Sequence, residues 1–160
     1  MNQQDGVALR PATESDRDFL RVLFASTRET ELAFLPGGAP ARAVFLDSQF
    51  NAQLQSYRRS FPLANHDIIE VDGIVAGRLY VDRTPQVLQL IDISLLPEYR
   101  GRGLGTALLQ ALLAEAAQVA GTVSLSVVKS NPARRLYERL GFRTVSCDGM
   151  YAFQVAGGDA

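Results

Sequence analysis

The 160-residue sequence predicts an α/β protein of the α+β kind, in which helices cover both faces of a mixed β-sheet. Strand-like and helix-like segments follow one another in the order β-α-α-β-β-β-α-β-α-β-β, which is not the strict alternation of a doubly wound fold. The length fits one domain over residues 1–160, with a core at about residues 5–155. Hydrophobic residues make up 47% and charged residues 21% of the chain, which is typical of a globular protein.

The first part of the chain predicts one strand and two helices. Val7–Arg10 alternates as a short strand, and Thr13-Glu-Ser-Asp16 has the composition of a helix N-cap with an acidic first turn. The helix that follows ends near residues 27–30. The breakers in Pro36-Gly-Gly-Ala-Pro40 predict a loop over residues 31–41, and a second helix follows over Ala43–Arg59.

The central part of the chain predicts three strands. Asp67–Val71 and Ile74–Val81 flank Asp72-Gly73, a dipeptide that favours the tight turn of a β-hairpin. Val87–Leu96 is a third apolar strand, and it ends at Pro97. The sequence therefore reaches a strand-to-helix junction near residue 100.

The last part of the chain alternates between helices and strands. Pro132 and Gly141 bracket the final helix, because proline favours the first helical position and glycine the residue after the last turn. The expected elements are a helix over about 103–119, a strand over Thr122–Val128, a helix from Asn131 to Leu140, and strands over Arg143–Ser146 and Met150–Gln154.

Composition excludes several classes of function. The formal net charge is −1, so no overall field favours nucleic acid or an anionic membrane as a partner. Cys147 and His66 are the only cysteine and histidine, which excludes an internal disulfide and the common cysteine and histidine metal sites. Residues 1–6 lack the pattern of a signal peptide, and no apolar run is long enough to span a membrane. We therefore expect a cytoplasmic protein without a metal.

The glycine loop, Arg100-Gly-Arg-Gly-Leu-Gly-Thr106, stands at the junction between the third central strand and a helix. Glycines allow close approach of a ligand, a helix N-terminus offers unpaired N–H groups, and arginine pairs with phosphate oxygens. The expected ligand is therefore a pyrophosphate. A Walker A loop would need Lys followed by Ser or Thr after its last glycine, whereas Gly105 is followed by Thr106-Ala107. A dinucleotide fingerprint would need G-x-G-x-x-G in the first βα unit. Here the glycines alternate at 101, 103 and 105, residue 106 is Thr, and the loop follows the fourth expected strand. Both alternative kinds of nucleotide site are therefore excluded.

The pattern R/Q-x-x-G-x-G/A is filled by Arg100, Gly103 and Gly105, within the block Ile91–Gly105. A second block, Asn131-Pro-Ala-Arg-Arg-Leu-Tyr-Glu-Arg-Leu-Gly-Phe142, follows at a suitable distance. In these two blocks the chain resembles the GCN5-related N-acetyltransferase (GNAT) family. The resemblance implies a mostly antiparallel sheet of six to seven strands that splays between strands 4 and 5, with acetyl-coenzyme A (acetyl-CoA) as the donor.

The resemblance also implies roles for individual residues. Tyr137 would protonate the departing thiolate, and Asn131 would bind near the pantetheine arm, which enters like an added strand. Leu95 and Leu96 would offer main-chain groups to that arm, and a backbone N–H at this strand end could stabilise the oxyanion. The remaining cofactor-binding residues are those of the glycine loop: Arg100, Gly101, Arg102, Gly103, Leu104, Gly105 and Thr106.

The general base is open at this level. Asp92 interrupts an apolar strand, which costs stability unless the carboxylate is paired or functional, so it is the leading candidate. It is equally well explained as a structural hydrogen-bond acceptor. Glu29, Glu31 and Glu70 are rivals, and the amine could also arrive neutral. Cys147 lies outside both blocks, which gives an acyl-cysteine route no support.

The expected function is acetyl transfer from acetyl-CoA to a primary amine by direct attack on the thioester. The alternatives are an inactive acyl-CoA sensor or interaction module on the same fold, and a donor with a longer acyl chain. The resemblance places the acceptor at about residues 28–41 and 143–151 and leaves its identity open. The protein would act as a monomer or homodimer, and neither nucleic acid nor a membrane is an expected partner. Two residues also have a purely structural interpretation: Tyr137 could be a core aromatic of the last helix, and Asn131 could be only an N-cap.

Overall fold

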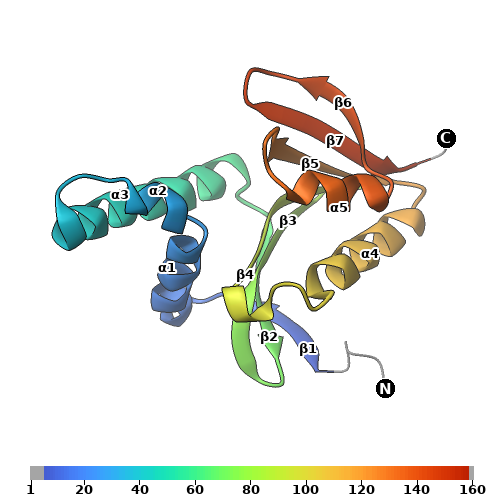
Figure 1. Ribbon diagram of the computed structural model, residues 1–160. Coiled ribbons are helices and arrows are strands. Elements are labelled where there is room, and N and C mark those ends of the chain that lie inside the picture. Colours follow the sequence, from blue (N-terminus) through green and yellow to red (C-terminus); the bar gives the residue numbers. More distant parts are fainter. Residues whose placement is uncertain (1–5, 159–160) are drawn as a thin grey trace. The chain divides into compact units, whose positions relative to one another are not determined.

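A computed structural model describes residues 6–158 of the chain (Figure 1). The chain forms two compact units. The first comprises Met1–Leu79 and Ser94–Arg100, and the second comprises Tyr80–Ile93 and Gly101–Ala160. Seven strands follow the order β1-β2-β3-β4-β5-β7-β6. This mixed sheet confirms the predicted fold class, and strands β3 and β4 each contribute residues to both units.

The first unit begins with an antiparallel strand pair and a hairpin. Strand β1 (Val7–Pro11) pairs with β2 (Asn65–Val71), in a register that runs from Val7 opposite Val71 to Pro11 opposite Asp67. Strand β3 (Ile74–Arg83) follows β2 after two residues. Asp72 and Gly73 in that turn have φ angles of 52° and 79°, as a type I′ turn requires. The predicted hairpin is therefore confirmed.

Helices of the first unit bury one apolar cluster against β2. Helix α1 (Arg17–Ser26) follows a short 3₁₀ turn, η1 (Glu14–Asp16), and packs beside α3 (Gly38–Ser60). The Phe24 and Phe50 rings of these helices lie 5.8 Å apart, centroid to centroid. The buried members of the cluster are Leu20, Leu23, Phe24, Leu46, Phe50, Leu54 and Ile68.

The predicted loop over residues 31–41 is wrong at both ends. A short helix, α2 (Glu29–Ala33), occupies its start, and α3 begins at Gly38 rather than at Ala43. Pro40 lies in the first turn of α3, where its missing N–H removes no intrahelical hydrogen bond. Gly37, with a φ of 100°, precedes the helix in the left-handed region. The Pro and Gly cluster therefore starts a helix instead of interrupting one.

The second unit contains the remaining strands and two helices. Strand β4 (Val87–Leu95) pairs in parallel with β5 (Thr122–Val128) over Val87–Leu90, opposite Thr122–Leu125. Beyond the paired residues, β4 continues to Leu95 and β5 to Val128. This agrees with the separation of the two strands that the resemblance implied. Strand β7 (Tyr151–Gly157) lies antiparallel between β5 and β6 (Arg143–Cys147).

Helix α4 (Leu104–Ala117) packs on β5 and β7, and α5 (Ala133–Arg139) connects β5 to β6 (Figure 1). The face of α4 that carries Leu108, Leu109 and Leu112 is buried, at 9%, 1% and 3% exposure. Strand β5 is buried at three consecutive positions, 123–125, as expected for a central strand that is covered on both faces. The buried hydrophobic residues of β5 and β7 are Val123, Leu125, Val127, Ala152 and Ala156, and the polar side chains of Ser124 and Gln154 on these strands are buried as well.

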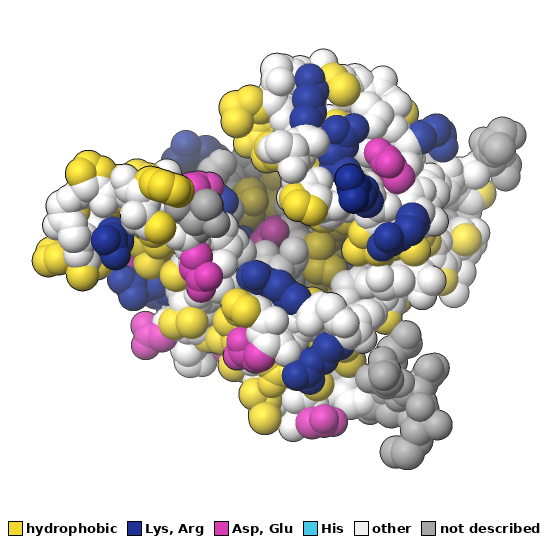
Figure 2. Space-filling model, in the orientation of Figure 1, with side chains coloured by type: hydrophobic (Ala, Val, Ile, Leu, Met, Phe, Trp, Pro, Cys, Tyr) yellow, Lys and Arg dark blue, Asp and Glu magenta, His cyan; other side chains and the backbone are white. Residues whose placement is uncertain are grey.

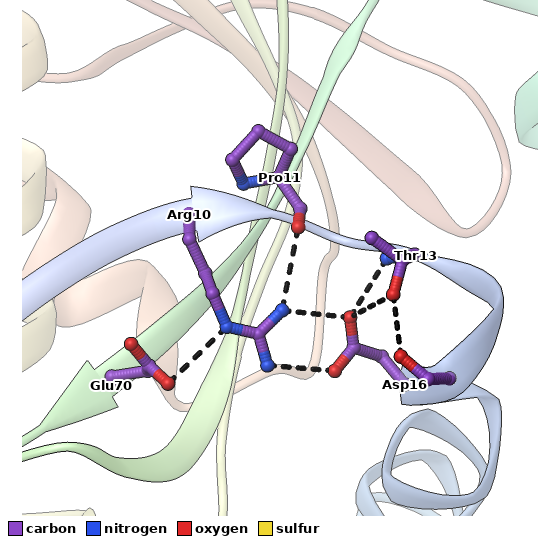
Figure 3. Close-up of polar contacts among 6 residues, drawn as sticks. Arg10, Pro11, Thr13, Asp16 and Glu70 are labelled. Atoms are coloured by element: carbon purple, nitrogen blue, oxygen red, sulfur yellow. Dashed lines mark hydrogen bonds and ion pairs between the residues drawn. The ribbon is translucent and has the colours of Figure 1, made fainter.

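One ionic network joins β1, β2 and the start of α1 in the first unit (Figure 3). Arg10 donates to both carboxylate oxygens of Asp16, at 2.9 and 2.8 Å, and its Nε donates to Glu70 at 3.2 Å. Asp16 also accepts the Thr13 backbone N–H at 2.8 Å, which completes a capping box. The Arg10 guanidinium holds the pKa of the Asp16 carboxyl well below its usual range.

This network predicts an acid-sensitive contribution to stability. We expect Asp16→Ala to lower the free energy of unfolding by about 1–2 kcal/mol at neutral pH, because a helix cap and charge-assisted hydrogen bonds are lost. Since the folded-state pKa of Asp16 is lowered, its contribution is complete above the unfolded pKa of about 4 and declines as the pH falls further. Urea unfolding from pH 7 to pH 3 measures both effects. Asp18→Ala, at an exposed site in the first turn of α1, is the control; equal loss in both variants would contradict the prediction.

Candidate functional site

The glycine loop leads directly into α4 in the second unit. Gly101 and Gly103 have φ angles of 73° and 80°, a conformation that L side chains rarely adopt. Gly103 is the N-cap of α4, and its carbonyl accepts the Ala107 N–H at 3.0 Å. The amides of residues 104–106 precede this first helical hydrogen bond, and no side chain caps the helix. The loop therefore presents a set of N–H donors at the positive end of a helix.

The three glycines of the loop border open space. A Cβ built at Gly101, Gly103 or Gly105 would meet no protein atom within 4 Å. At Gly105 the φ angle also allows a side chain, so neither packing nor backbone conformation of the protein requires glycine there. The room that these glycines leave, beside unpaired helix N–H groups, suits the oxygens of a pyrophosphate.

Leu104 anchors the glycine loop to the core of the second unit. Its side chain is 6% exposed, whereas Gly101, Arg102 and Gly103 are exposed and Thr106 is half-buried. Because its side chain is buried, Leu104 can offer only its main chain to a ligand, as the glycines of the loop do. The apolar side chain fixes the start of α4 in place.

The charge of Asp92 acts on Tyr137 within the second unit. Tyr137 lies in α5, and its ring contacts the Phe142 ring edge to face at 5.8 Å between centroids. Burial raises the pKa of the Tyr137 phenol, and the negative charge of Asp92 on β4 raises it further. The hydroxyl is therefore protonated at neutral pH, as an ordinary tyrosine is, and the shift makes it a weaker acid rather than a stronger one.

Asn131 caps α5. Its Oδ1 accepts the Ala133 N–H at 2.9 Å, and its carbonyl accepts the Arg134 N–H at 3.1 Å. Pro132 has helical angles, φ −57° and ψ −24°, at the first turn. The cap leaves the Nδ2 amide as the group of the Asn131 side chain that could donate to a ligand.

Leu95, Leu96 and Arg100 lie in the first unit, around the 3₁₀ turn η2 (Pro97–Tyr99). The Leu96 N–H donates to Ala76 at 2.8 Å, and the Leu96 carbonyl accepts the Tyr99 N–H at 2.9 Å. The Leu96 N–H is thus engaged within the chain, whereas its carbonyl retains a second lone pair. The Leu95 carbonyl accepts from Arg100 Nε at 2.9 Å and retains a second lone pair.

Arg100 reaches back toward α1. Its Nη2 donates to the Ser26 hydroxyl at 3.2 Å, in addition to the bond from Nε to Leu95. No local sequence pattern connects Ser26, 74 positions away, with Arg100. The guanidinium therefore braces the end of β4 and keeps its other N–H groups as donors.

The rival bases have different surroundings. Glu70 pairs with Arg10 in the network of Figure 3, so its carboxylate already has a structural role. Glu31 lies 3.9 Å from Arg28, and Glu29 is exposed. Of the four carboxylates considered, Asp92 is the one whose charge acts on Tyr137.

The segment expected to meet the acceptor in the first unit carries an apolar groove of about 630 Å³. It lies over the link between α2 and α3 and over the first turns of α3. The groove is lined by Leu35, Pro36, Pro40, Ala41, Val44, Phe45 and Ser48. The other expected acceptor segment, residues 143–151 of the second unit, is exposed throughout.

No helix within residues 6–158 is long and apolar enough to cross a bilayer. The same residues contain no group of three or more His, Cys, Asp or Glu side chains placed to hold a metal ion.

Known proteins resemble this chain in sequence and in fold. The model of the acetyltransferase (GNAT) family matches residues 25–142, a stretch that includes parts of both units. An N-alpha-acetyltransferase of Sulfurisphaera tokodaii is 34% identical over 111 residues, which are 60% of this chain and 64% of that protein. The chain thus spans less than two thirds of the length of the curated relatives it matches.

Solved structures share the fold at low sequence identity. An N-acetyltransferase from Thermoplasma acidophilum in complex with coenzyme A has a TM-score of 0.69 at 15% identity, over 94% of this chain and 98% of that one. An acetyltransferase from Thermus thermophilus has a TM-score of 0.67 at 22% identity, over 98% and 99%. The glycine loop at the start of α4, the seven-stranded sheet and the match over residues 25–142 lead to one conclusion: the chain belongs to the GNAT acetyltransferase family.

Proposed function

We propose that the protein is an acetyl-CoA-dependent N-acetyltransferase that acts on a primary amine. The observation that carries the proposal is the open glycine loop at the uncapped N-terminus of α4, which suits a pyrophosphate. Relatives support the donor and the chemistry, since one is named an N-alpha-acetyltransferase and one fold neighbour was crystallised with coenzyme A. We propose that residues 1–160 act as one acetyltransferase domain.

The glycine loop would hold the pyrophosphate through its main-chain N–H groups. Arg100 and Arg102 would add charge, and Asn131 would donate from Nδ2 near the pantetheine arm. At the end of β4, we assign a main-chain contact with the pantetheine arm to the Leu95 carbonyl. The Leu96 N–H is used by the Ala76 carbonyl, which argues against this N–H as the oxyanion donor, and the Leu96 carbonyl would be a second acceptor for the pantetheine arm.

When bound, acetyl-CoA supplies an activated acetyl thioester whose carbonyl carbon an amine can attack, with release of the thiol. Tyr137 would hold a proton on its hydroxyl and donate it to the departing thiolate. The phenol carries this proton at neutral pH, and the assignment rests on the motif that Tyr137 shares with the family. Asp92 would accept the proton of the amine, directly or through water, and its charge helps to keep Tyr137 protonated.

The acceptor would be a primary amine, and the name of the Sulfurisphaera relative makes peptide α-amines the first class to test. The groove at the start of α3 would suit an apolar group beside that amine. We further propose a cytoplasmic protein that works as a monomer or homodimer.

An amine panel tests the proposed function. The purified chain is mixed with acetyl-CoA and peptide α-amines, lysine side chains, polyamines or small amines, and thiol release and acetylated product are measured together. We expect stoichiometric thiol and acetylated product with one class. Binding of coenzyme A by calorimetry without thiol release on any amine would favour a sensor instead, and a chain that does not bind coenzyme A would refute both.

A further inference from the structure

The turn between β5 and α5 places Asn131. Its N–H donates to the Val128 carbonyl at 2.9 Å, and its Oδ1 caps Ala133. The neighbouring Lys129 N–H donates to the Met150 carbonyl at 2.8 Å, in the turn that precedes β7. Three segments of the second unit, the end of β5, the start of α5 and the β6–β7 turn, therefore meet at residues 129–131.

One side chain completes this junction. Arg134, in the first turn of α5, folds back and donates from Nη1 to the Lys129 carbonyl at 3.0 Å. Both main-chain groups of Lys129 are then engaged, one by Met150 and one by Arg134. The guanidinium thus ties α5 to the residue that leaves β5 and closes the turn that holds Asn131.

One donor of the Arg134 guanidinium has no acceptor in this junction. The Nε of Arg134 is buried and has no hydrogen-bond partner in the structure. A buried donor without an acceptor destabilises the folded state, so stability alone does not explain an arginine at this position.

We propose that Arg134 is a positioning residue for cofactor binding, acting through the Lys129 carbonyl on the turn that carries Asn131. The inference rests on the proposed function and concerns a residue that does not itself touch the reacting atoms. Arg135, its neighbour, is exposed and carries the same charge. Figure 2 shows several basic side chains over the part of the second unit that contains α5 and β6, so charge alone does not distinguish Arg134.

Three variants test the proposal: Arg134→Ala, Arg134→Lys and Arg135→Ala. We expect Arg134→Ala to raise the KM for acetyl-CoA and the Kd for coenzyme A about fivefold, the effect of weakening about one hydrogen bond, with kcat nearly unchanged. Arg134→Lys should restore both constants, and Arg135→Ala should leave them near the values of the parent chain. Hydrogen exchange should show faster exchange of the Asn131 and Ala133 amides in Arg134→Ala alone.

The outcomes separate the inference from the function on which it rests. If the parent chain neither binds coenzyme A nor acetylates an amine, the proposed function fails, and hydrogen exchange still reports whether Arg134 orders the turn. If the parent chain is active and Arg134→Ala matches it, the positioning role is refuted. Equal losses in Arg134→Ala and Arg135→Ala that shrink at high salt would also refute it, because they indicate general attraction of phosphate.

Discussion

Tyr137→Phe is expected to lower kcat for acetyl transfer more than tenfold and to leave the Kd for coenzyme A nearly unchanged. The variant removes one hydroxyl and keeps the ring that packs on Phe142. A leaving thiolate without a proton donor loses general acid catalysis, which typically contributes about 10²–10⁴-fold. Steady-state kinetics with the acceptor found in the amine panel, together with calorimetry, measures the two constants.

Two further measurements make the result specific to the Tyr137 hydroxyl. Tyr57→Phe removes a phenol from α3 in the first unit and should have little effect on kcat. Burial and Asp92 raise the pKa of Tyr137, so in the parent chain kcat should not fall from loss of this proton until the pH exceeds about 10. Full activity of Tyr137→Phe would remove Tyr137 from the mechanism.

Gly105→Ala is expected to stabilise the fold and to weaken cofactor binding, two effects of opposite sign. Gly105 lies in the first turn of α4 without a positive φ, so alanine should raise the free energy of unfolding by about 0.5–1 kcal/mol. Its methyl group would enter the open space where we place the pyrophosphate. The Kd for coenzyme A should rise about tenfold or more, which corresponds to about 1.4 kcal/mol.

Matched variants distinguish this effect from general damage. Gly149→Ala also adds a methyl group in open space of the second unit, without a positive φ, and should leave binding intact. Gly103→Ala should lose both stability and affinity, because its φ of 80° strains any L side chain. Unchanged affinity for coenzyme A in Gly105→Ala would place the pyrophosphate elsewhere.

Local sequence signals predicted most of the elements. The Asp72-Gly73 turn fixes its hairpin because both residues adopt a positive φ, and β5 was predicted with the bounds that the structure gives it. The error at residues 31–41 arose because proline was treated as a breaker, whereas Pro40 occupies the first turn of a helix, where proline is tolerated. Helix boundaries depend on such positions more than on composition.

The parts of the candidate site that lie in one short segment could be predicted from the sequence. The contacts between residues far apart in the sequence could not. The glycine loop and the Asn131 cap follow from short motifs with a local physical cause. The engagement of Leu96 by Ala76 depends on strand pairing, and the bond from Arg100 to Ser26 joins residues 74 positions apart. The action of Asp92 on Tyr137 joins a strand to a helix 45 positions later, which no local pattern reports.

The buried side chain of Leu104 has a consequence for the energetics of binding. Because this residue secures the start of α4 to the core, the donors that follow Gly103 are already oriented in the free protein. A preorganised site loses little conformational entropy when its ligand arrives, and more of the interaction energy becomes affinity. Folding and recognition are thereby linked, so a cavity-forming change such as Leu104→Ala should weaken coenzyme A binding without removing any group that touches it.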